Sequence, residues 1–331
     1  MSYQDVTINT TPWFHRGGLH CAGPGPAFYA GATIVVLSKF DAKTTLRYVD
    51  RYCITFIVGV PTVLEELADE QSRHAYDISS LKGVVTMGSP LTRADCIRYQ
   101  KVLTPNIFNG YGTTETFWNT FLRPFDLPDN AGTAGASCID DDVRVVKIYE
   151  DRKAEPDDLA AQDGTEVGEV IMCSPAKSPY TYHNNAVETE KKYYKDFLYT
   201  NDLATWDENS FVTIVGRKDD MIISSGENIY PTEVEAVLNT HPKVSDCIVT
   251  SVPDKMRGQI VTAYIVMADD SLTAEELDEF CKSSQEISNF KRPRYYRFVK
   301  QIPFNATGKK LHVVAKETAL QDYKNGLLYR V

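Results

Sequence analysis

The segment from Phe108 to Glu115 holds the densest group of side chains able to do chemistry, in the order Phe-Asn-Gly-Tyr-Gly-Thr-Thr-Glu. An apolar run precedes it, so we expect a short strand that ends in a loop. The glycines let backbone approach a ligand closely, and Tyr111 offers a flat face for a base. Thr114 can donate to a phosphate oxygen, and Glu115 can hold a magnesium ion. A tight turn with a surface acid would have the same residues, so both interpretations stay open.

Five other segments could also contact a ligand, although each has an ordinary structural explanation. The loop Gly88-Ser89-Pro90 follows a predicted strand, where such a sequence is more often just a turn. Asp202 could accept both hydroxyls of a ribose and Arg217 could donate to the same sugar, but both could be surface charges. The loop within residues 222–231 has small side chains, so a thin arm of a substrate could pass close to its backbone. Lys309, on a Gly-containing loop, could reach into a cleft, although most such lysines are solvated surface charges.

Composition excludes several classes of protein. The 331 residues are enough for about two domains, and 43% are hydrophobic, as in a soluble globular protein. The net charge of −10 argues against nucleic-acid binding. Seven cysteines without a Cys-x-x-Cys pair indicate reduced thiols and a cytoplasmic protein, and argue against zinc. The polar start and the lack of a long apolar run predict neither a signal peptide nor a membrane span.

The elements that would position these residues fall into three stretches. In the first, helices alternate with strands, which predicts a mostly parallel sheet covered on both faces. A helix should begin at Pro61, with Leu64 and Leu67 on its buried face. Leu46, Val49 and Cys53 recur at helical spacing. The predicted strands are residues 33–37, 54–60, 82–87 and 106–109.

The middle stretch has short strands separated by Gly, Asp, Asn and Pro, which indicates a small antiparallel barrel or sheet. These strands are residues 143–148, 168–173 and 211–215. A charged break at residues 216–220 precedes a compact α/β unit. That unit should hold a helix from Pro231 with an apolar face (Val234, Val237, Leu238), strands at 246–252 and 260–267, and a helix with a capping box from Thr273 to Glu276 that bears Leu277, Phe280 and Cys281.

The predicted fold class is therefore α/β. It comprises part of a parallel-sheet domain over residues 1–135, a β-rich subdomain over 136–216, and a compact α/β domain over 217–331.

Five segments, in this order, resemble the adenylate-forming (AMP-binding) superfamily of acyl-CoA synthetases, luciferases and peptide-synthetase adenylation domains. The resemblance runs from residue 5 to about residue 318. Its motifs are Thr10–His15 (P-x-F-H), Asn109–Glu115 (G-Y-G-x-T-E), Tyr199–Leu203 (Y-x-T-G-D, with Asn201 in place of the usual glycine), Gly216–Pro231 (G-R-x-D-D-x-I-x-x-x-G-x-x-x-x-P) and Asn305–Leu311 (N-x-x-G-K-x-x).

The resemblance implies a nucleotide site. Tyr111 would stack on adenine, Thr114 would contact the α-phosphate, and Glu115 would bind magnesium. Asp202 would hold the ribose hydroxyls, with Arg217 assisting. The matching positions also place Gly88, Ser89, Pro90, Asn109, Gly110, Gly112 and Thr113 in this site.

The resemblance also implies roles in catalysis. Lys309 would bridge the attacking carboxylate and the α-phosphate, and His15 would sit near the acyl carbonyl. Asp219 would be the hinge of the last domain. The thiol tunnel would include Ser225, Gly226 and Glu227, and the acyl pocket would include Trp13, Thr116, Phe117 and Trp118. The bulk of these walls suggests a medium, cyclic or aromatic acid rather than acetate, or else these aromatics are simply core.

The implied activity is that of an acyl-CoA ligase that uses ATP, Mg²⁺ and CoA on a small carboxylic acid. The family's Ser/Thr/Gly-rich phosphate loop with its lysine has no counterpart in this sequence. We therefore expect a truncated form, a split-gene subunit or a degenerate remnant, with exposed apolar edges that favour a homo-oligomer or a separate N-terminal partner. The alternatives are a non-catalytic nucleotide- or CoA-binding protein and amino-acid adenylation for a carrier protein.

Overall fold

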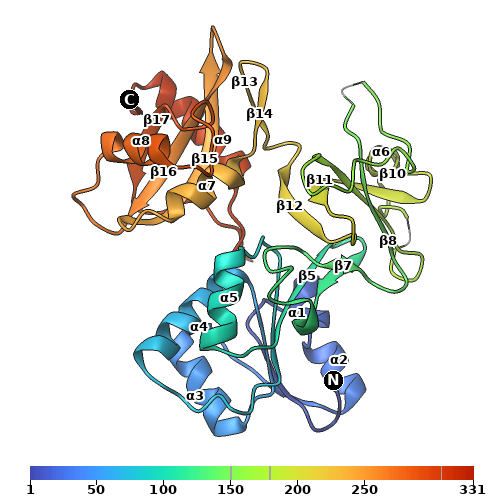
Figure 1. Cartoon of the computed structure of the whole chain (residues 1–331). Coiled ribbons are helices and arrows are strands. Elements are labelled where there is room, and N and C mark those ends of the chain that lie inside the picture. The colour runs from blue at the N-terminus through green and yellow to red at the C-terminus, as the bar shows by residue number, and fades with distance from the viewer. Residues whose placement is uncertain (150, 179, 307) are drawn as a thin grey trace. The chain divides into compact units, whose positions relative to one another are not determined.

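The structure is a computed structural model that describes residues 1–149, 151–178, 180–306 and 308–331. Thr307, inside the last sequence motif, lies outside the described residues. The chain forms two compact units (Figure 1). Unit 1 comprises Met1–Thr200 and Ala204–Ile214, and unit 2 comprises Asn201–Leu203 and Val215–Val331. No helix in the described ranges is long and apolar enough to cross a membrane.

Unit 1 contains a seven-stranded sheet in the order β2-β1-β3-β4-β5-β6-β7. The first five strands of this order are parallel, as the alternation of helices and strands predicts, whereas β6 and β7 are antiparallel additions. The strands are β1 Val6–Asn9, β2 Thr33–Val35, β3 Phe56–Gly59, β4 Gly83–Met87, β5 Ile107–Thr113, β6 Phe117–Leu122 and β7 Ala136–Ser137.

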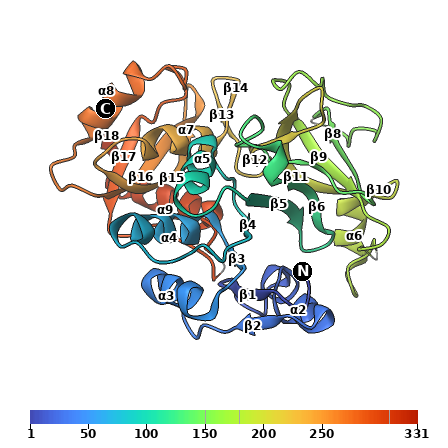
Figure 2. The ribbon, with the colours of Figure 1, turned by 60° about the horizontal axis from the view of Figure 1, so that its bottom comes forward.

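Successive residues of the parallel strands face opposite sides of this sheet. Ile57, Val84 and Ile107 pack under α3 (Ala42–Tyr52), α4 (Pro61–Arg73) and α5 (Arg93–Val102), which form one layer in Figure 2. Pro61 opens α4, and Leu64 and Leu67 are buried, as predicted. The next residues, Val58, Val85 and Phe108, face the other side, where they cluster with Cys21 between α1 (Arg16–His20) and α2 (Pro24–Ala30).

The prediction of a loop after Asn109 is wrong. Strand β5 continues to Thr113 and pairs with β6, so that Thr113 lies opposite Phe117. A Cβ on Gly112 would lie 1.5 Å from the carbonyl oxygen of Phe117, so this glycine is required by close pairing of two strands rather than by a flexible loop.

A second sheet has the order β10-β11-β9-β8, with β12 paired to β11. It belongs to unit 1 except for residues 201–203 of β11 and 215–217 of β12, which are counted with unit 2. The three middle strands predicted from sequence are β8, β9 and β12, and the β8–β9 and β10–β11 pairs are antiparallel. The elements are β8 Asp142–Val146, β9 Gly168–Cys173, β10 Tyr193–Tyr194, β11 Phe197–Trp206 and β12 Val212–Arg217, with helix α6 Ala186–Lys192 and a 3₁₀ turn at Pro124–Asp126.

Unit 2 is built on a six-stranded sheet in the order β14-β13-β16-β17-β18, with β15 paired to β16. Its strands are β13 Ile222–Ser224, β14 Glu227–Ile229, β15 Val244–Asp254, β16 Gly258–Met267, β17 Tyr295–Val299 and β18 Tyr329–Arg330. Its helices are α7 Pro231–Asn239, α8 Ala274–Ser283 and α9 His312–Lys324.

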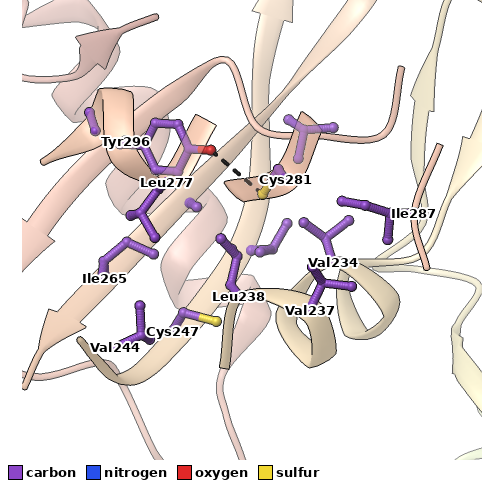
Figure 3. Close-up of a cluster of buried hydrophobic side chains, with 14 of the residues drawn as sticks. Val234, Val237, Leu238, Val244, Cys247, Ile265, Leu277, Cys281, Ile287 and Tyr296 are labelled. Atoms are coloured by element: carbon purple, nitrogen blue, oxygen red, sulfur yellow. Dashed lines mark hydrogen bonds between the residues drawn. The ribbon is translucent and has the colours of Figure 1, made fainter. Parts of the chain in front are cut away.

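Helices cover both faces of the unit 2 sheet. On one face, Val234, Val237 and Leu238 of α7 pack with α8 and with inward residues of β15 and β16, as the sequence predicts (Figure 3). The Tyr296 hydroxyl approaches Cys281 Sγ at 4.0 Å within this core. On the other face, α9 packs against the alternate residues of the same two strands, including Ile248.

Residues 222–231, predicted as a strand followed by a loop, instead form a β-hairpin. Ser224 pairs with Glu227, which leaves Ser225 and Gly226 as a two-residue turn with φ values of 55° and 84°. Positive φ at both turn positions matches the twist of the flanking strands.

Only one of the two hydrogen bonds of the predicted capping box before α8 forms. The Thr273 side chain accepts from the backbone N–H of Glu276, at 3.1 Å. The Glu276 carboxylate instead lies 2.9 Å from Lys243 Nζ. All seven cysteines are free thiols, as predicted.

Replacing Gly112 with alanine should lower the free energy of unfolding of unit 1 by about 3 kcal/mol or more, since the new methyl group must push two paired strands apart. All three tryptophans, Trp13, Trp118 and Trp206, belong to unit 1, so their fluorescence during urea unfolding follows this unit. Gly164→Ala is the control, because Gly164 has positive φ but no neighbour within 4 Å. Equal losses in the two variants would contradict the steric explanation.

Candidate functional site

Two of the predicted ligand-binding segments meet at the carboxyl edge of the parallel strands in unit 1. Met87, the last residue of β4, pairs with Gly110 in β5. The loop that starts at Gly88 therefore lies beside Tyr111. Gly88 has a φ of 88°, which glycine adopts without strain. Carboxyl edges of this kind are where open α/β sheets bind ligands.

The hairpin fixes the side chains of its first strand. Tyr111 packs against the core of the second sheet, which includes Val145 and Met172. Asn109 is buried, and its side-chain amide donates to the Thr133 carbonyl at 3.2 Å. Asn109 thus braces the strand, whereas Tyr111 is only half-buried.

Glu115 lies in the three-residue connection between β5 and β6. The Tyr182 hydroxyl donates to its Oε1 at 2.5 Å. Burial, the largest single influence, raises the pKa of Glu115, but hydrogen bonds from Tyr182, from its own backbone and from Thr113, and the charge of Lys192, together bring it below its ordinary value. The side chain is thus an ionised carboxylate, the form that binds a cation. No group of three His, Cys, Asp or Glu side chains suited to a metal occurs among the described residues.

Helix α1 meets the tip of this hairpin. The Arg16 guanidinium donates to the Thr114 carbonyl and lies 5.2 Å from the centre of the Phe117 ring. His15 is the N-cap of α1, where its Nδ1 accepts from the backbone N–H of Gly17 at 3.1 Å. The structure therefore brings the His15 segment next to the hairpin tip with Thr114 and Phe117, although about a hundred residues separate the two segments in sequence.

A row of aromatic rings covers the sheet face beside this tip. Phe117 stacks on Trp118 with ring centres 5.2 Å apart, and Trp118 contacts Phe121 at 4.9 Å. Gly110 makes room for this row, because a Cβ there would come within 2.8 Å of the Trp118 ring. Sequence reasoning singled out Phe117 and Trp118 but missed Phe121 and Phe108, although Phe108 could have been found by alternation along β5.

Two predicted pocket residues are placed differently. Thr116 is completely buried, and its hydroxyl donates to Asn119 Oδ1 at 2.6 Å. The hydroxyl of Thr116 is thus engaged in the protein interior, and its place in the acyl pocket stays a prediction. Trp13 is 39% exposed and does not join the ring contacts of Phe117 and Trp118.

Thr116 begins a buried hydrogen-bond chain that sequence reasoning missed. Asn119 donates to Ser174 Oγ at 2.5 Å, Ser174 donates to Asp141 at 2.8 Å, and the Lys177 ammonium pairs with the same carboxylate. This chain ties the β5–β6 hairpin to the second sheet. Its members are ordinary polar residues spread over about 60 positions of the sequence, and no local sequence pattern predicts that they interact.

Unit 2 holds the other predicted group. Arg217 Nη1 donates to Asp202 Oδ1 at 2.7 Å, and the Asn201 amide donates to Asp219 at 3.1 Å. Asn201 has a φ of 63°, a conformation that favours glycine and that Asn tolerates better than most residues. This backbone geometry explains why Asn can stand where the motif carries glycine.

Lys309 lies on a closed turn in unit 2. The turn is held by a bridge between Phe304 and Lys310 and by the Asn305 side chain, which accepts from the Lys309 N–H at 2.9 Å. The Lys309 side chain is exposed and has no hydrogen bond or ion pair with any described residue. Even so, the dense surroundings lower the pKa of its ammonium, an effect that the charge of Asp202 partly offsets.

The predicted thiol-tunnel residues Ser225, Gly226 and Glu227 form the exposed tip of the β13–β14 hairpin. A Cβ on Gly226 would meet nothing within 4 Å. The glycine therefore serves the turn geometry rather than a close approach inside this unit.

The sequence matches two known family models. Residues 1–177 match the AMP-binding enzyme family, and residues 233–309 match the AMP-binding enzyme C-terminal domain. The chain belongs to the AMP-binding enzyme family. This membership confirms the resemblance drawn from the five motifs.

Curated relatives of this AMP-binding chain include carboxylate–CoA ligases. It is 32% identical over 306 residues to a long-chain-fatty-acid–CoA ligase of Bacillus subtilis, covering 92% of this chain and 52% of the relative. It is 34% identical over 311 residues to a mitochondrial medium-chain acyl-CoA ligase of Homo sapiens, covering 91% of this chain and 48% of the relative. The chain spans about half the length of the curated relatives it matches.

Solved structures show the same fold. The o-succinylbenzoate CoA synthetase of Bacillus subtilis in complex with its acyl-adenylate intermediate superposes with a TM-score of 0.83 and 28% identity. The match covers 96% of this chain and 61% of the synthetase. The predicted α/β fold class is therefore confirmed.

Proposed function

We propose that this chain carries the adenine, metal and lysine contacts of an ATP-dependent acyl-CoA ligase. One observation carries the proposal. Lys309 is exposed on a turn that the Asn305 side chain holds in place, and its ammonium has no hydrogen bond or ion pair with any described residue. The negative charge of Asp202, the proposed ribose contact, acts on this ammonium and raises its pKa against the lowering effect of its dense surroundings. A protein that only binds a nucleotide has no need of such a cation. A reaction that joins two anions does.

The proposed chemistry has two steps. A carboxylate oxygen attacks the α-phosphorus of ATP, which forms acyl-adenylate and releases pyrophosphate. The thiol of CoA then attacks the acyl carbonyl, which forms the thioester and releases AMP. In the first step the ammonium of Lys309 would bridge the attacking carboxylate and the α-phosphate, while magnesium held by Glu115 would supply further positive charge.

The chain's own residues support separate tasks. In unit 1, the half-buried Tyr111 would stack on adenine, with Thr114 near the phosphate and Gly88 beside the base. In unit 2, Asp202 and Arg217 suit the ribose hydroxyls. The same synthetase from Bacillus subtilis has been solved with ATP and a magnesium ion, at a TM-score of 0.81, which supports these as the co-substrate and metal. The hinge at Asp219 and the thiol tunnel at Ser225 to Glu227 remain predictions.

The aromatic row supports a bulky acyl group. Phe117 and Trp118 stay partly exposed beside the hairpin tip, where a substrate carboxylate would have to lie. Related enzymes are described as ligases for medium-chain, long-chain and succinylbenzoate acids. We propose a medium-chain, cyclic or aromatic acid as the substrate class.

The first test is carboxylate-dependent ATP–pyrophosphate exchange on the purified chain, over short, long, cyclic and aromatic acids with magnesium. We expect exchange with a bulky acid and little with acetate. Exchange with acetate alone would overturn the proposed acyl class. No exchange with any acid, together with measurable AMP binding, would favour a non-catalytic nucleotide-binding protein or a subunit that requires a separate front section.

Lys309→Ala should abolish exchange but spare thioester formation from chemically prepared acyl-adenylate, because the lysine is needed only where two anions meet. The expected loss is about 100-fold or more in adenylate formation. Single-turnover assays of each half-reaction measure the difference. An equal loss in both would contradict the role proposed for Lys309.

Asp202→Ala should weaken AMP binding about tenfold or more, since two ribose hydroxyls lose a charged acceptor. Isothermal titration calorimetry measures the affinity. Asp322→Ala, which removes another ion-paired aspartate of unit 2, is the control. Unchanged AMP affinity in the Asp202 variant would refute the ribose contact.

A further inference from the structure

Two adjacent lysines at the end of the last motif have opposite environments. Lys309 has no side-chain partner among the described residues. The Lys310 ammonium, by contrast, donates to the Cys247 carbonyl at 2.6 Å and lies 2.8 Å from the Asp246 carboxylate. It also lies 3.7 Å from Glu235. Lys310 is therefore fixed to unit 2 at a position one residue away from the proposed catalytic cation.

Glu235 is the centre of this arrangement. It lies on α7, is 5% exposed, and its Oε1 accepts from the backbone N–H of Val249 in β15 at 2.8 Å. The same oxygen lies 2.7 Å from His312 Nε2. One buried carboxylate thus joins α7 and β15 to Lys310 and His312, the two residues that flank Leu311.

The charges of this cluster support one another. A buried carboxylate is costly unless it is paired and hydrogen-bonded. His312 opens α9, where the helix dipole disfavours a positive charge. Burial, the largest influence, lowers the pKa of His312, but the hydrogen bond and charge of Glu235 and the charge of Asp220 raise it above its ordinary value of 6.5 despite Lys310. Glu235 therefore favours the imidazolium that it binds.

We propose that Glu235, Lys310 and His312 form an anchor that holds the turn carrying Lys309, with Glu235 as a positioning residue. The anchor clamps the turn on its C-terminal side, at Lys310 and His312. Two further hydrogen bonds hold the turn itself. The Asn305 side chain accepts from the Lys309 N–H, and the Leu311 N–H donates to the Pro303 carbonyl at 2.9 Å. Its relevance to catalysis depends on the function proposed for Lys309, but its structural basis does not.

The chain offers a matched control on the same helix. Glu233, two residues before Glu235, pairs with Lys291 at 2.6 Å, and the Lys291 side chain is 22% exposed against 21% for Lys310. Lys291 lies outside the 303–312 segment. Lys291→Met therefore removes an ion pair of the same kind from α7 without touching the proposed anchor.

The test is hydrogen–deuterium exchange by mass spectrometry on the full chain, which needs neither ATP nor activity. Glu235→Gln, Lys310→Met and His312→Gln should each raise exchange in peptides covering residues 303–312 by about tenfold or more, the effect of one lost charge-assisted hydrogen bond. Lys310→Arg should restore most of the protection, and Lys291→Met should leave it unchanged. Unchanged protection in Lys310→Met, or an equal loss in Lys291→Met, would overturn the anchor.

The pH dependence of hydrogen–deuterium exchange distinguishes a local effect of the anchor from a change in the overall stability of the fold. The raised pKa of His312 means that its charged pair with Glu235 is complete below about pH 6.5 and is lost as pH rises through the raised value. After correction for intrinsic exchange, the 303–312 peptides should lose protection over that rise in the native chain but not in His312→Gln. A pH response that persists in His312→Gln would assign it to another group. If these results hold while pyrophosphate exchange is absent, the proposed function fails and the anchor stands.

Discussion

The close approach of Gly112 to the Phe117 carbonyl, where β5 pairs with β6, is the constraint on which the rest of unit 1 depends. A side chain at position 112 would collide with a carbonyl oxygen 1.5 Å away, so only glycine allows β6 to lie against β5. This pairing turns the chain at Thr114 and Glu115 and sets Trp118 over Gly110. The segment Asn109–Glu115, which looks like a ligand-binding loop in sequence, thus also forms a tight hairpin beside the parallel strands.

The sequence predicts the elements of this fold well where burial decides them. The helices at Pro61 and Pro231 begin at the expected prolines, and their apolar faces are the buried ones. Strand β9 has the predicted bounds, because both of its faces are covered. Such elements have local patterns that tertiary contacts reinforce.

The errors occur where distant pairing overrides a local signal. Residues 110–113 contain two glycines and look like a loop, but β6 supplies partners that make them a strand. Thr116 stands beside an aromatic pair in sequence, and the polar network that it forms with Asn119 and Ser174 was missed. The Glu235 anchor was also missed, because Glu235 lies 77 residues before His312 and each member looks like an ordinary charged residue.

The different environments of the adjacent residues Lys309 and Lys310 have a consequence for how the sequence of such a chain can evolve. Lys310 is paired within the fold, whereas the Lys309 side chain has no hydrogen bond or ion pair with any described residue. Selection for folding alone therefore retains Lys310 and is indifferent to Lys309. Under the function proposed above, a descendant that lost its chemistry would remain folded without Lys309, so a lysine at position 309 would report on activity and a lysine at position 310 on folding.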